Sequence, residues 1–179
     1  DLSIGGDGLI QSLYIEGNVL HDNAQNGLNL DGVQASILRN NVIYGNGLNG
    51  IRAYAIDGAE GPSDLDIVNN TILTGARRID GYAGSIRMSG VYWGLQPRKR
   101  PLLANNVIGL LEDPHHVCSV ARRAVSNVVL RGVACRGPNR VGRVHLDSDG
   151  QPTAGSNLLI DRASRRLGAR RDIDGRPRD

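Results

Sequence analysis

The sequence predicts an all-β solenoid of short parallel strands, and two observations carry that prediction. First, a block of the chain repeats after 23 residues. Its repeated positions are Ile15, Asn18, Leu20, Asn23, Gly27, Leu28 and Leu30, which return as Leu38, Asn41, Ile43, Asn46, Gly50, Ile51 and Ala53. Second, each unit holds short apolar pieces separated by Asn-Gly, Gly-Asn or Asn-Asn, without an apolar stripe at helical spacing. This content favours stacked coils of strands over helical or leucine-rich repeats.

Later coils repeat the same core at longer intervals. Four positions of the second unit return 29 residues on, as Ile67, Asn70, Ile72 and Gly75. Three of them return again after a further 36 residues, as Leu103, Asn106 and Ile108. The growing spacing predicts insertions in the loops between strands, which is where solenoids accommodate them.

One asparagine recurs in every coil, and its chemistry explains why. Asparagine tolerates the left-handed backbone region, so it suits a sharp corner between two short strands. Coils that stack about 4.8 Å apart would place these amides above one another, where they can form a hydrogen-bonded ladder. The predicted structural ladder consists of Asn18, Asn41, Asn70 and Asn106.

A family resemblance follows from these segments. YIEGNVLHDNAQNGLNL, SILRNNVIYGNGLNGIRAY, DIVNNTILTG and LLANNVIG fit an I-x-x-N-x-I-x-x-N-x-x-x-G-I pattern across residues 9–110. In this the chain resembles the right-handed parallel β-helix repeat proteins of the pectate-lyase-like superfamily. The resemblance implies a right-handed parallel β-helix, a single-stranded solenoid of about 23-residue coils with loop insertions.

The end of the chain resembles a second feature of such proteins. Residues 155–178, GSNLLIDRASRRLGARRDIDGRPR, look like the closing segment of secreted bacterial β-helix proteins. We therefore expect β-helix coils over residues 1–139, beginning within a coil as a fragment of a longer protein, and an irregular closing segment over residues 140–179 packed on the helix. The resemblance implies a secreted or cell-surface location. Residues 111–150 contain strand-like pieces, but we expect no further asparagine corner there.

Charge is distributed unevenly along the 179 residues, whose formal net charge is +3. Residues 1–121 carry 8 basic and 12 acidic side chains, whereas residues 122–179 carry 13 basic and 6 acidic ones. A basic segment attracts phosphate, but this one has no aromatic residue to stack on bases and its arginines alternate with aspartates. We expect no nucleic-acid partner, no membrane span and a monomer, with the basic segment packed against the acidic coils.

Two enlarged loops form the predicted functional face. The interval from the glycine of the Gly-Ile step to the next Asn-Asn pair grows from 13 residues to 19 and then 21 in consecutive coils. The enlargements fall at the same point of adjacent coils, so loops 57–66 and 91–101 should be neighbours. The first offers Asp57, Glu60, Asp64 and Asp66, and the second offers Tyr92, Trp93, Arg98, Lys99 and Arg100.

These residue types suit a polysaccharide as partner. Trp93 and Tyr92 can stack on a sugar ring, and the charged groups can bind its carboxylates or hydroxyls. A polysaccharide lyase would use Lys99, Arg98 or Arg100 as base or as the cation that neutralises a uronate, with Asp57, Glu60 and Asp64 holding Ca²⁺. A glycoside hydrolase would use two carboxylates, such as Asp57 and Glu60. The alternative is a non-catalytic surface, carbohydrate-binding or structural module whose acidic and basic loop residues only pair with one another.

Three further motifs have simpler interpretations. Gly45, Gly47 and Gly50 match G-x-G-x-x-G, but no helix pattern follows, so we expect them to serve corners of a coil. His115 and His116 lack a third ligand at fixed spacing, and an exposed loop is expected there. Cys118 and Cys135, 17 residues apart, are either a disulfide across neighbouring turns or two buried thiols.

Overall fold

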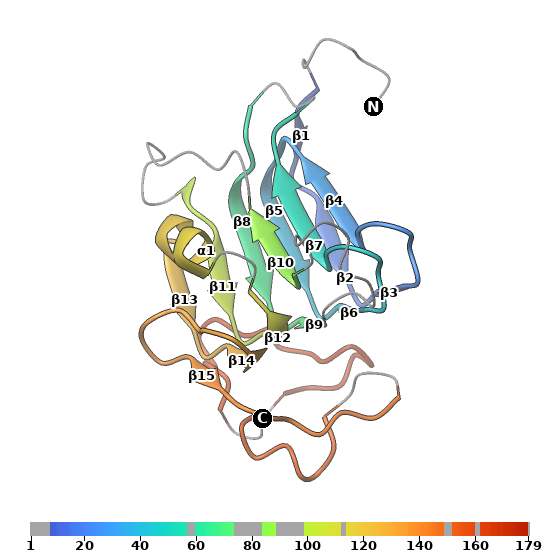
Figure 1. Cartoon of the computed structure of the whole chain (residues 1–179), viewed down its shortest axis with the longest axis vertical. Helices are drawn as coiled ribbons and strands as arrows, with labels where there is room; N and C mark the ends of the chain where they lie inside the picture. The colour runs from blue at the N-terminus through green and yellow to red at the C-terminus, as the bar shows by residue number, and fades with distance from the viewer. Residues whose placement is uncertain are drawn as a thin grey trace.

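The structure is a computed structural model that describes residues 8–56, 60–73, 84–88, 99–111, 114–148, 152–159 and 162–178. Its strands form three parallel sheets (Figure 1). Sheet I contains β1 (Ile10–Gln11), β2 (Tyr14–Glu16), β5 (Val33–Arg39), β8 (Ser63–Val68), β11 (Leu102–Ala104) and β13 (Arg123–Val125). Sheet II contains β3 (Val19–His21), β6 (Val42–Tyr44), β9 (Thr71–Ile72), β12 (Val107–Leu110), β14 (Val128–Arg131) and β15 (Arg140–Val141). Sheet III contains β4 (Leu28–Asp31), β7 (Ile51–Tyr54) and β10 (Ile86–Met88).

The register of the sheets confirms the repeat. Each of the first three coils contributes strands in turn to sheets I, II and III, the next two contribute described strands only to sheets I and II, and neighbouring coils pair in parallel. In sheet I the core column runs through Ile15, Leu38, Ile67, Leu103 and Ala124. In sheet II it runs through Leu20, Ile43, Ile72, Ile108 and Val129. The parallel β-solenoid predicted from the sequence is therefore the observed fold.

Hydrogen bonds between asparagine side chains join every pair of neighbouring coils. The Oδ1 of Asn41 accepts both the backbone N–H and the Nδ2 of Asn18, each at 3.0 Å. Asn70 does the same for Asn41, and Asn106 for Asn70. From Asn41 onward each Nδ2 also donates to a backbone carbonyl one coil back, as Asn70 does to Leu38 at 2.9 Å. The buried amides thus satisfy backbone groups that the turn between sheets I and II leaves without strand partners.

The ladder extends further than the sequence pattern suggested. Asn127 accepts two bonds from Asn106, and Asn139 accepts two from Asn127. The expectation that residues 111–150 hold no asparagine corner was therefore wrong. The shift from Asn106 to Asn127 is 21 residues, and Ser126 replaces the first asparagine of the usual pair, which hid the repeat.

The left-handed backbone falls on the residue before each ladder asparagine from Asn18 to Asn127. The φ angles are 54° at Asn40, 57° at Asn69, 58° at Asn105 and 55° at Ser126. The ladder residue itself has no positive φ, so its recurrence reflects its hydrogen bonds and not its tolerance of the left-handed region. In each Asn-Asn pair, the first residue makes the corner and the second makes the ladder.

Close contact between coils accounts for the glycines of the G-x-G-x-x-G match. A Cβ on Gly47 would lie 1.9 Å from the carbonyl oxygen of Ala24 in the preceding coil. One on Gly50 would lie 2.4 Å from Ile72 Cγ2 in the following coil. Only glycine permits this approach at either position. The motif is a feature of coil packing.

One helix, α1 (Pro114–Val120), lies among the described strands and follows the bridge between Ile86 and Leu111. Its Val117 and Val120 are buried in the main core, and it packs against β10. The loop predicted at His115 and His116 was wrong, because proline at the first helical position leads directly into this helix, although His115 is exposed and His116 is half-buried. In the described part of the chain no helix has the length and apolarity to cross a membrane.

A disulfide joins Cys118 of α1 to Cys135, which follows β14, with their Cα atoms 5.2 Å apart. This decides between the two states that the sequence left open. The bond ties the helix to the fifth coil, and the described residues contain no free cysteine.

The closing segment runs back along the corner between sheets I and II. Asn105 exchanges two hydrogen bonds with Ser164, and Asn69 Oδ1 accepts the backbone N–H of Ala169 at 2.8 Å. Leu167 packs on a small outer cluster formed by Val68, Leu102, Ala104 and Val125. The corner asparagines therefore hold the closing segment on the solenoid. The first two residues of the predicted closing region, Arg140 and Val141, form strand β15 of sheet II.

Replacing Asn70 by alanine is expected to destabilise the protein by about 2–4 kcal/mol, because the buried Asn41 N–H and Leu38 carbonyl would lose partners. Urea unfolding followed by circular dichroism measures this. Asn23→Ala is the matched control, since Asn23 is exposed in a shorter column and its loss should cost about 1 kcal/mol or less. Equal losses in the two variants would contradict the assigned role of the ladder.

The double variant Cys118→Ala/Cys135→Ala is expected to lose about 3 kcal/mol of unfolding free energy, as loop entropy predicts for a 17-residue separation. Reducing agent should shift the unfolding midpoint of the wild type towards that of the double variant and leave the variant unchanged. Two reactive thiols in the denatured, unreduced wild type would show that the bond is absent.

Candidate functional site

The two enlarged loops occupy the same position in adjacent coils. One joins β7 to β8 and the other joins β10 to β11, so both cross from sheet III to sheet I. Asp57, Tyr92, Trp93 and Arg98 lie outside the described residues, and their predicted roles stay predictions. The described candidates are Glu60, Asp64, Asp66, Lys99 and Arg100.

Glu60 continues a column of hydrogen-bonded polar side chains at the start of sheet I, in which Gln11 and Gln34 precede it. Its Oε2 accepts a hydrogen bond from Gln34 Nε2 at 3.1 Å, and Gln34 Oε1 accepts one from Gln11. Gln34 Nε2 also donates to the carbonyl of Gly61 at 3.0 Å. These contacts give Glu60 a structural role in stacking the coils.

Asp64 and Asp66 project from β8 and share one cation, Arg122. Nη1 of Arg122 lies 2.9 Å from Asp64 Oδ1, and Nη2 bonds Asp66 Oδ1. Arg122 lies between α1 and β13, and its backbone N–H donates to the Pro101 carbonyl at 2.8 Å. Since Arg123 pairs with Leu102, Arg122 corresponds to Pro101 and comes from the coil after the one that carries Lys99 and Arg100, whose predicted roles stay predictions.

Burial of Asp66 raises the pKa of its carboxyl above the ordinary 3.8. Arg122 opposes this shift by stabilising the ionised form, and the nearby Asp64 adds to it by charge repulsion. The cluster therefore holds two close carboxylates in different environments, bridged by one guanidinium.

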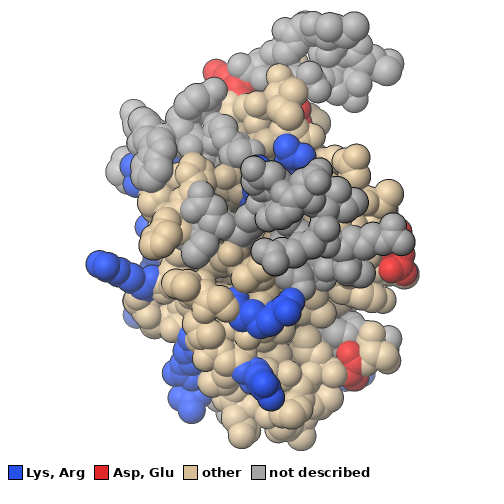
Figure 2. All heavy atoms as spheres, viewed as in Figure 1, with Lys and Arg blue, Asp and Glu red and all other residues tan. Residues whose placement is uncertain are grey.

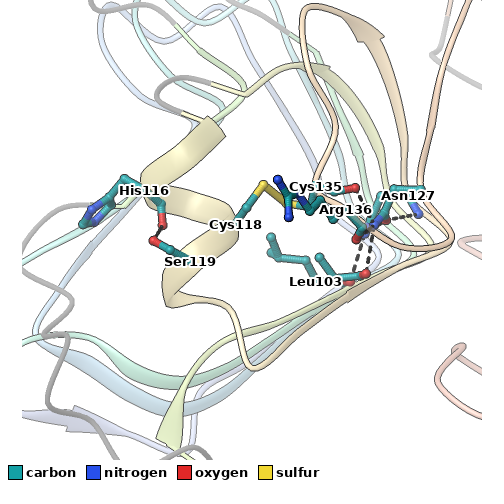
Figure 3. The surroundings of a disulfide bond; sticks show 9 residues. Leu103, His116, Cys118, Ser119, Asn127, Cys135 and Arg136 are labelled. Carbon is teal, nitrogen blue, oxygen red and sulfur yellow. Dashed lines mark hydrogen bonds between the residues drawn. A yellow bond between two sulfur atoms is a disulfide. The ribbon is translucent and has the colours of Figure 1, made fainter.

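A hollow of about 430 Å³ opens beside this cluster. Its basic and polar lining comes from α1, from the start of β13 and from the loop after β14, and comprises His115, Ser119, Arg122, Arg123 and Arg136. The disulfide forms part of the wall, and Figure 3 shows Cys118 reaching from α1 to Cys135 with Arg136 next to it. Asn139, the last ladder residue, donates from Nδ2 to the carbonyls of Cys135 and Arg136, so the ladder also positions this wall.

Calcium ligands do not assemble among the described residues. No group of three histidine, cysteine or carboxylate side chains lies close enough there to hold a metal ion. Asp64 is engaged by Arg122 and Glu60 by Gln34, which leaves the predicted set of Asp57, Glu60 and Asp64 dependent on a residue outside the described ranges.

Arg122, Arg123 and Arg136 were missed because the fifth coil was not recognised. The signal was present: Val125-Ser126-Asn127-Val128-Val129 repeats the form of Ala104-Asn105-Asn106-Val107-Ile108. Aligning the two segments places Arg123 above Leu102 and Asp66 on the outer face of sheet I, as the register shows.

The fold and its ladder define the class of protein, a parallel β-solenoid whose coils are joined by stacked asparagines. The family described as "Right handed beta helix region" matches residues 2–91, half of the chain, and the chain belongs to that family. No curated protein and no solved structure matches the sequence.

Replacing Arg122 by alanine is expected to raise the pKa of Asp66 further, because burial and the Asp64 charge remain while the stabilising cation is lost. Carboxyl ¹³C shifts followed by NMR across the acid range measure it, with Arg136→Ala as control.

The sign of the stability effect follows from the same shift. Since the folded-state pKa of Asp66 lies above 3.8, the contribution of Asp66 to stability falls as pH rises from 3.8 through the folded-state value. In the Arg122→Ala variant the folded-state pKa of Asp66 should be higher, so the pH range over which stability falls should extend to higher pH. An unchanged Asp66 titration would contradict the proposed coupling.

Proposed function

We propose that this β-helix protein is extracellular and binds an acidic polysaccharide at the hollow beside α1 and the outer face of sheet I. The observation that carries the proposal is the lining of the hollow by Arg123 and Arg136, next to Arg122, whose guanidinium is bound by Asp64 and Asp66. Guanidinium groups bind planar carboxylates through paired hydrogen bonds, and a volume of about 430 Å³ falls within the usual range of ligand sites.

The charge distribution supports the same partner. Figure 2 shows Lys and Arg side chains spread over the lower part of one face, where Figure 1 places β14, β15 and the closing segment. Acidic side chains are few there. Absence of aromatic residues from 122–179 favours a uronate-bearing glycan over a nucleic acid, which would need rings for its bases.

Localisation outside the cell is supported by the disulfide. Bonds between cysteines persist in oxidising compartments and are rare where thiols are kept reduced. The bond between Cys118 and Cys135 lines the hollow, so the proposed site would depend on that environment.

A catalytic version of this function is the second candidate, and Asp64 with Asp66 favours it. A hydrolase needs one protonated and one ionised carboxyl group across a glycosidic bond, and burial of Asp66 favours its protonated form. A lyase needs a cation for the uronate, which Arg122 or Lys99 would supply. The bridge from Arg122 to both carboxylates favours the non-catalytic module, in which these groups only join neighbouring coils.

Affinity electrophoresis in gels containing a uronate polymer tests binding. Retardation is expected in the uronate gel and not in a neutral glucan gel, and added salt should weaken it because the attraction is between charges. Arg123→Ala/Arg136→Ala should lower retention at least several-fold, whereas Arg170→Ala, an exposed arginine of the closing segment, should not. Equal migration of the protein in the two gels would refute the proposal.

Incubation with the same polymers, with and without Ca²⁺, separates the catalytic version from the binding version. Unsaturated products would indicate a lyase, and new reducing ends without them a hydrolase. Asp66→Asn should abolish either signal while leaving retention intact. If a polymer that retards the protein in the gel yields neither product, the function is binding alone.

A further inference from the structure

A second pocket, of about 250 Å³, lies between the closing segment and the corner of sheets I and II. The ladder side of its wall is formed by the Asn-Asn pairs and by the first residues of β6, β9, β12 and β14. The described residues on its other side come from positions 152, 158–159, 162–163, 172–173 and 178 of the closing segment. None of the residues named above for the α1 hollow lines this pocket.

The pocket is built by specific contacts and is not a loose gap. Asn40 Nδ2 donates to the Arg171 carbonyl at 2.7 Å, and Asn40 Oδ1 accepts from Arg178 Nη2 at 3.2 Å. Arg178 also donates from Nε to the Arg171 carbonyl at 3.2 Å. Together with the bonds of Asn69 and Asn105, these contacts fix the closing segment at three successive coils.

Its lining combines apolar surface with two cations. Val42, Val107 and Val128 present buried side chains from sheet II, and the closing segment supplies Leu158 and Ile173 opposite them.

Arg162 and Arg178 are the cations, and Thr71 adds a hydroxyl. Asp172 also lines the pocket, but its Oδ1 accepts the Arg176 backbone N–H at 2.7 Å. The described lining residues thus carry two guanidinium groups and one carboxylate, which leaves one formal positive charge.

We propose that this pocket binds a small carboxylate with an apolar face, of the class of a single hexuronic acid unit. Arg162 and Arg178 would bind the carboxylate, Thr71 would bond a ring hydroxyl, and the valines would contact the apolar face of the ring. About 250 Å³ is below the usual size of sites for larger ligands, which suits one ring rather than a chain segment.

This site differs in place and lining from the hollow of the proposed function and does not rest on it. The ligand can be a free sugar acid or the terminal unit of a polymer, because both present the same carboxylate and ring. Bound ligand would contact the coils and the closing segment together, so it should also hold that segment on the solenoid.

Isothermal titration with galacturonic acid, galactose and a galacturonate trimer tests the proposal on the full chain. Galacturonic acid is expected to bind at least ~10-fold more tightly than galactose, since only the acid meets the arginines. Arg162→Gln should weaken its binding ~10-fold, and Thr71→Val should weaken it less. Arg166→Gln, an exposed arginine of the same segment that does not line the pocket, is the matched control and should bind as the wild type does.

NMR shifts of the Thr71 and Val107 amides place the ligand, and Arg123→Ala/Arg136→Ala separates the two sites. That double variant should bind the monomer normally even where retention by the polymer is lost. If the trimer also binds, and Arg162→Gln weakens trimer and monomer binding by the same factor, the ligand is the terminal unit of a polymer. If only the monomer binds, the ligand is the free acid. Equal affinity for galactose, unchanged affinity in Arg162→Gln, or shifts confined to the α1 hollow would overturn the proposal.

Discussion

The solenoid depends on one interaction, the hydrogen bonds that each ladder asparagine makes to the coils on both sides. A turn between two short strands exposes backbone N–H and C=O groups that no strand can pair, and in a stacked coil these groups are buried. Asn41, Asn70, Asn106 and Asn127 satisfy them with one side chain per coil. Because each amide also bonds the next, neighbouring coils must keep a common register at this corner whatever the length of their loops.

Both candidate sites are attached to that corner. On one side, Asn139 ends the ladder and holds the loop that carries Cys135 and Arg136, which walls the α1 hollow. On the other side, the left-handed residues Asn40, Asn69 and Asn105 turn their amides outward and bind the closing segment. The two asparagines of each pair therefore have different roles. The second forms the ladder inside the solenoid, and the first binds the closing segment.

Recognition of the fold from the sequence succeeded where the repeat was regular and failed where it was not. The first four coils share Asn18, Asn41, Asn70 and Asn106 with apolar neighbours at fixed offsets, and a periodic pattern needs no knowledge of distant contacts. The fifth coil was missed because Ser126 replaces an asparagine and because α1 precedes this coil, at the point where the first three coils have a strand of sheet III. Because this coil was missed, Arg122 was missed too. The structure places Arg122 against Asp64 and Asp66, although 56 residues separate Arg122 from Asp66.

By itself the sequence determined the solenoid, its ladder and the column in which the enlarged loops fall, because these follow from local spacing and from the chemistry of asparagine. Only the tertiary structure decided which cation meets which carboxylate, that Cys118 pairs with Cys135, and that the closing segment returns over three coils to form a pocket. Those outcomes depend on how insertions of unequal length bring distant residues to the same height on the solenoid. Spacing along the chain fixes the height of a coil, but the path of its loops is fixed only when the coils are packed.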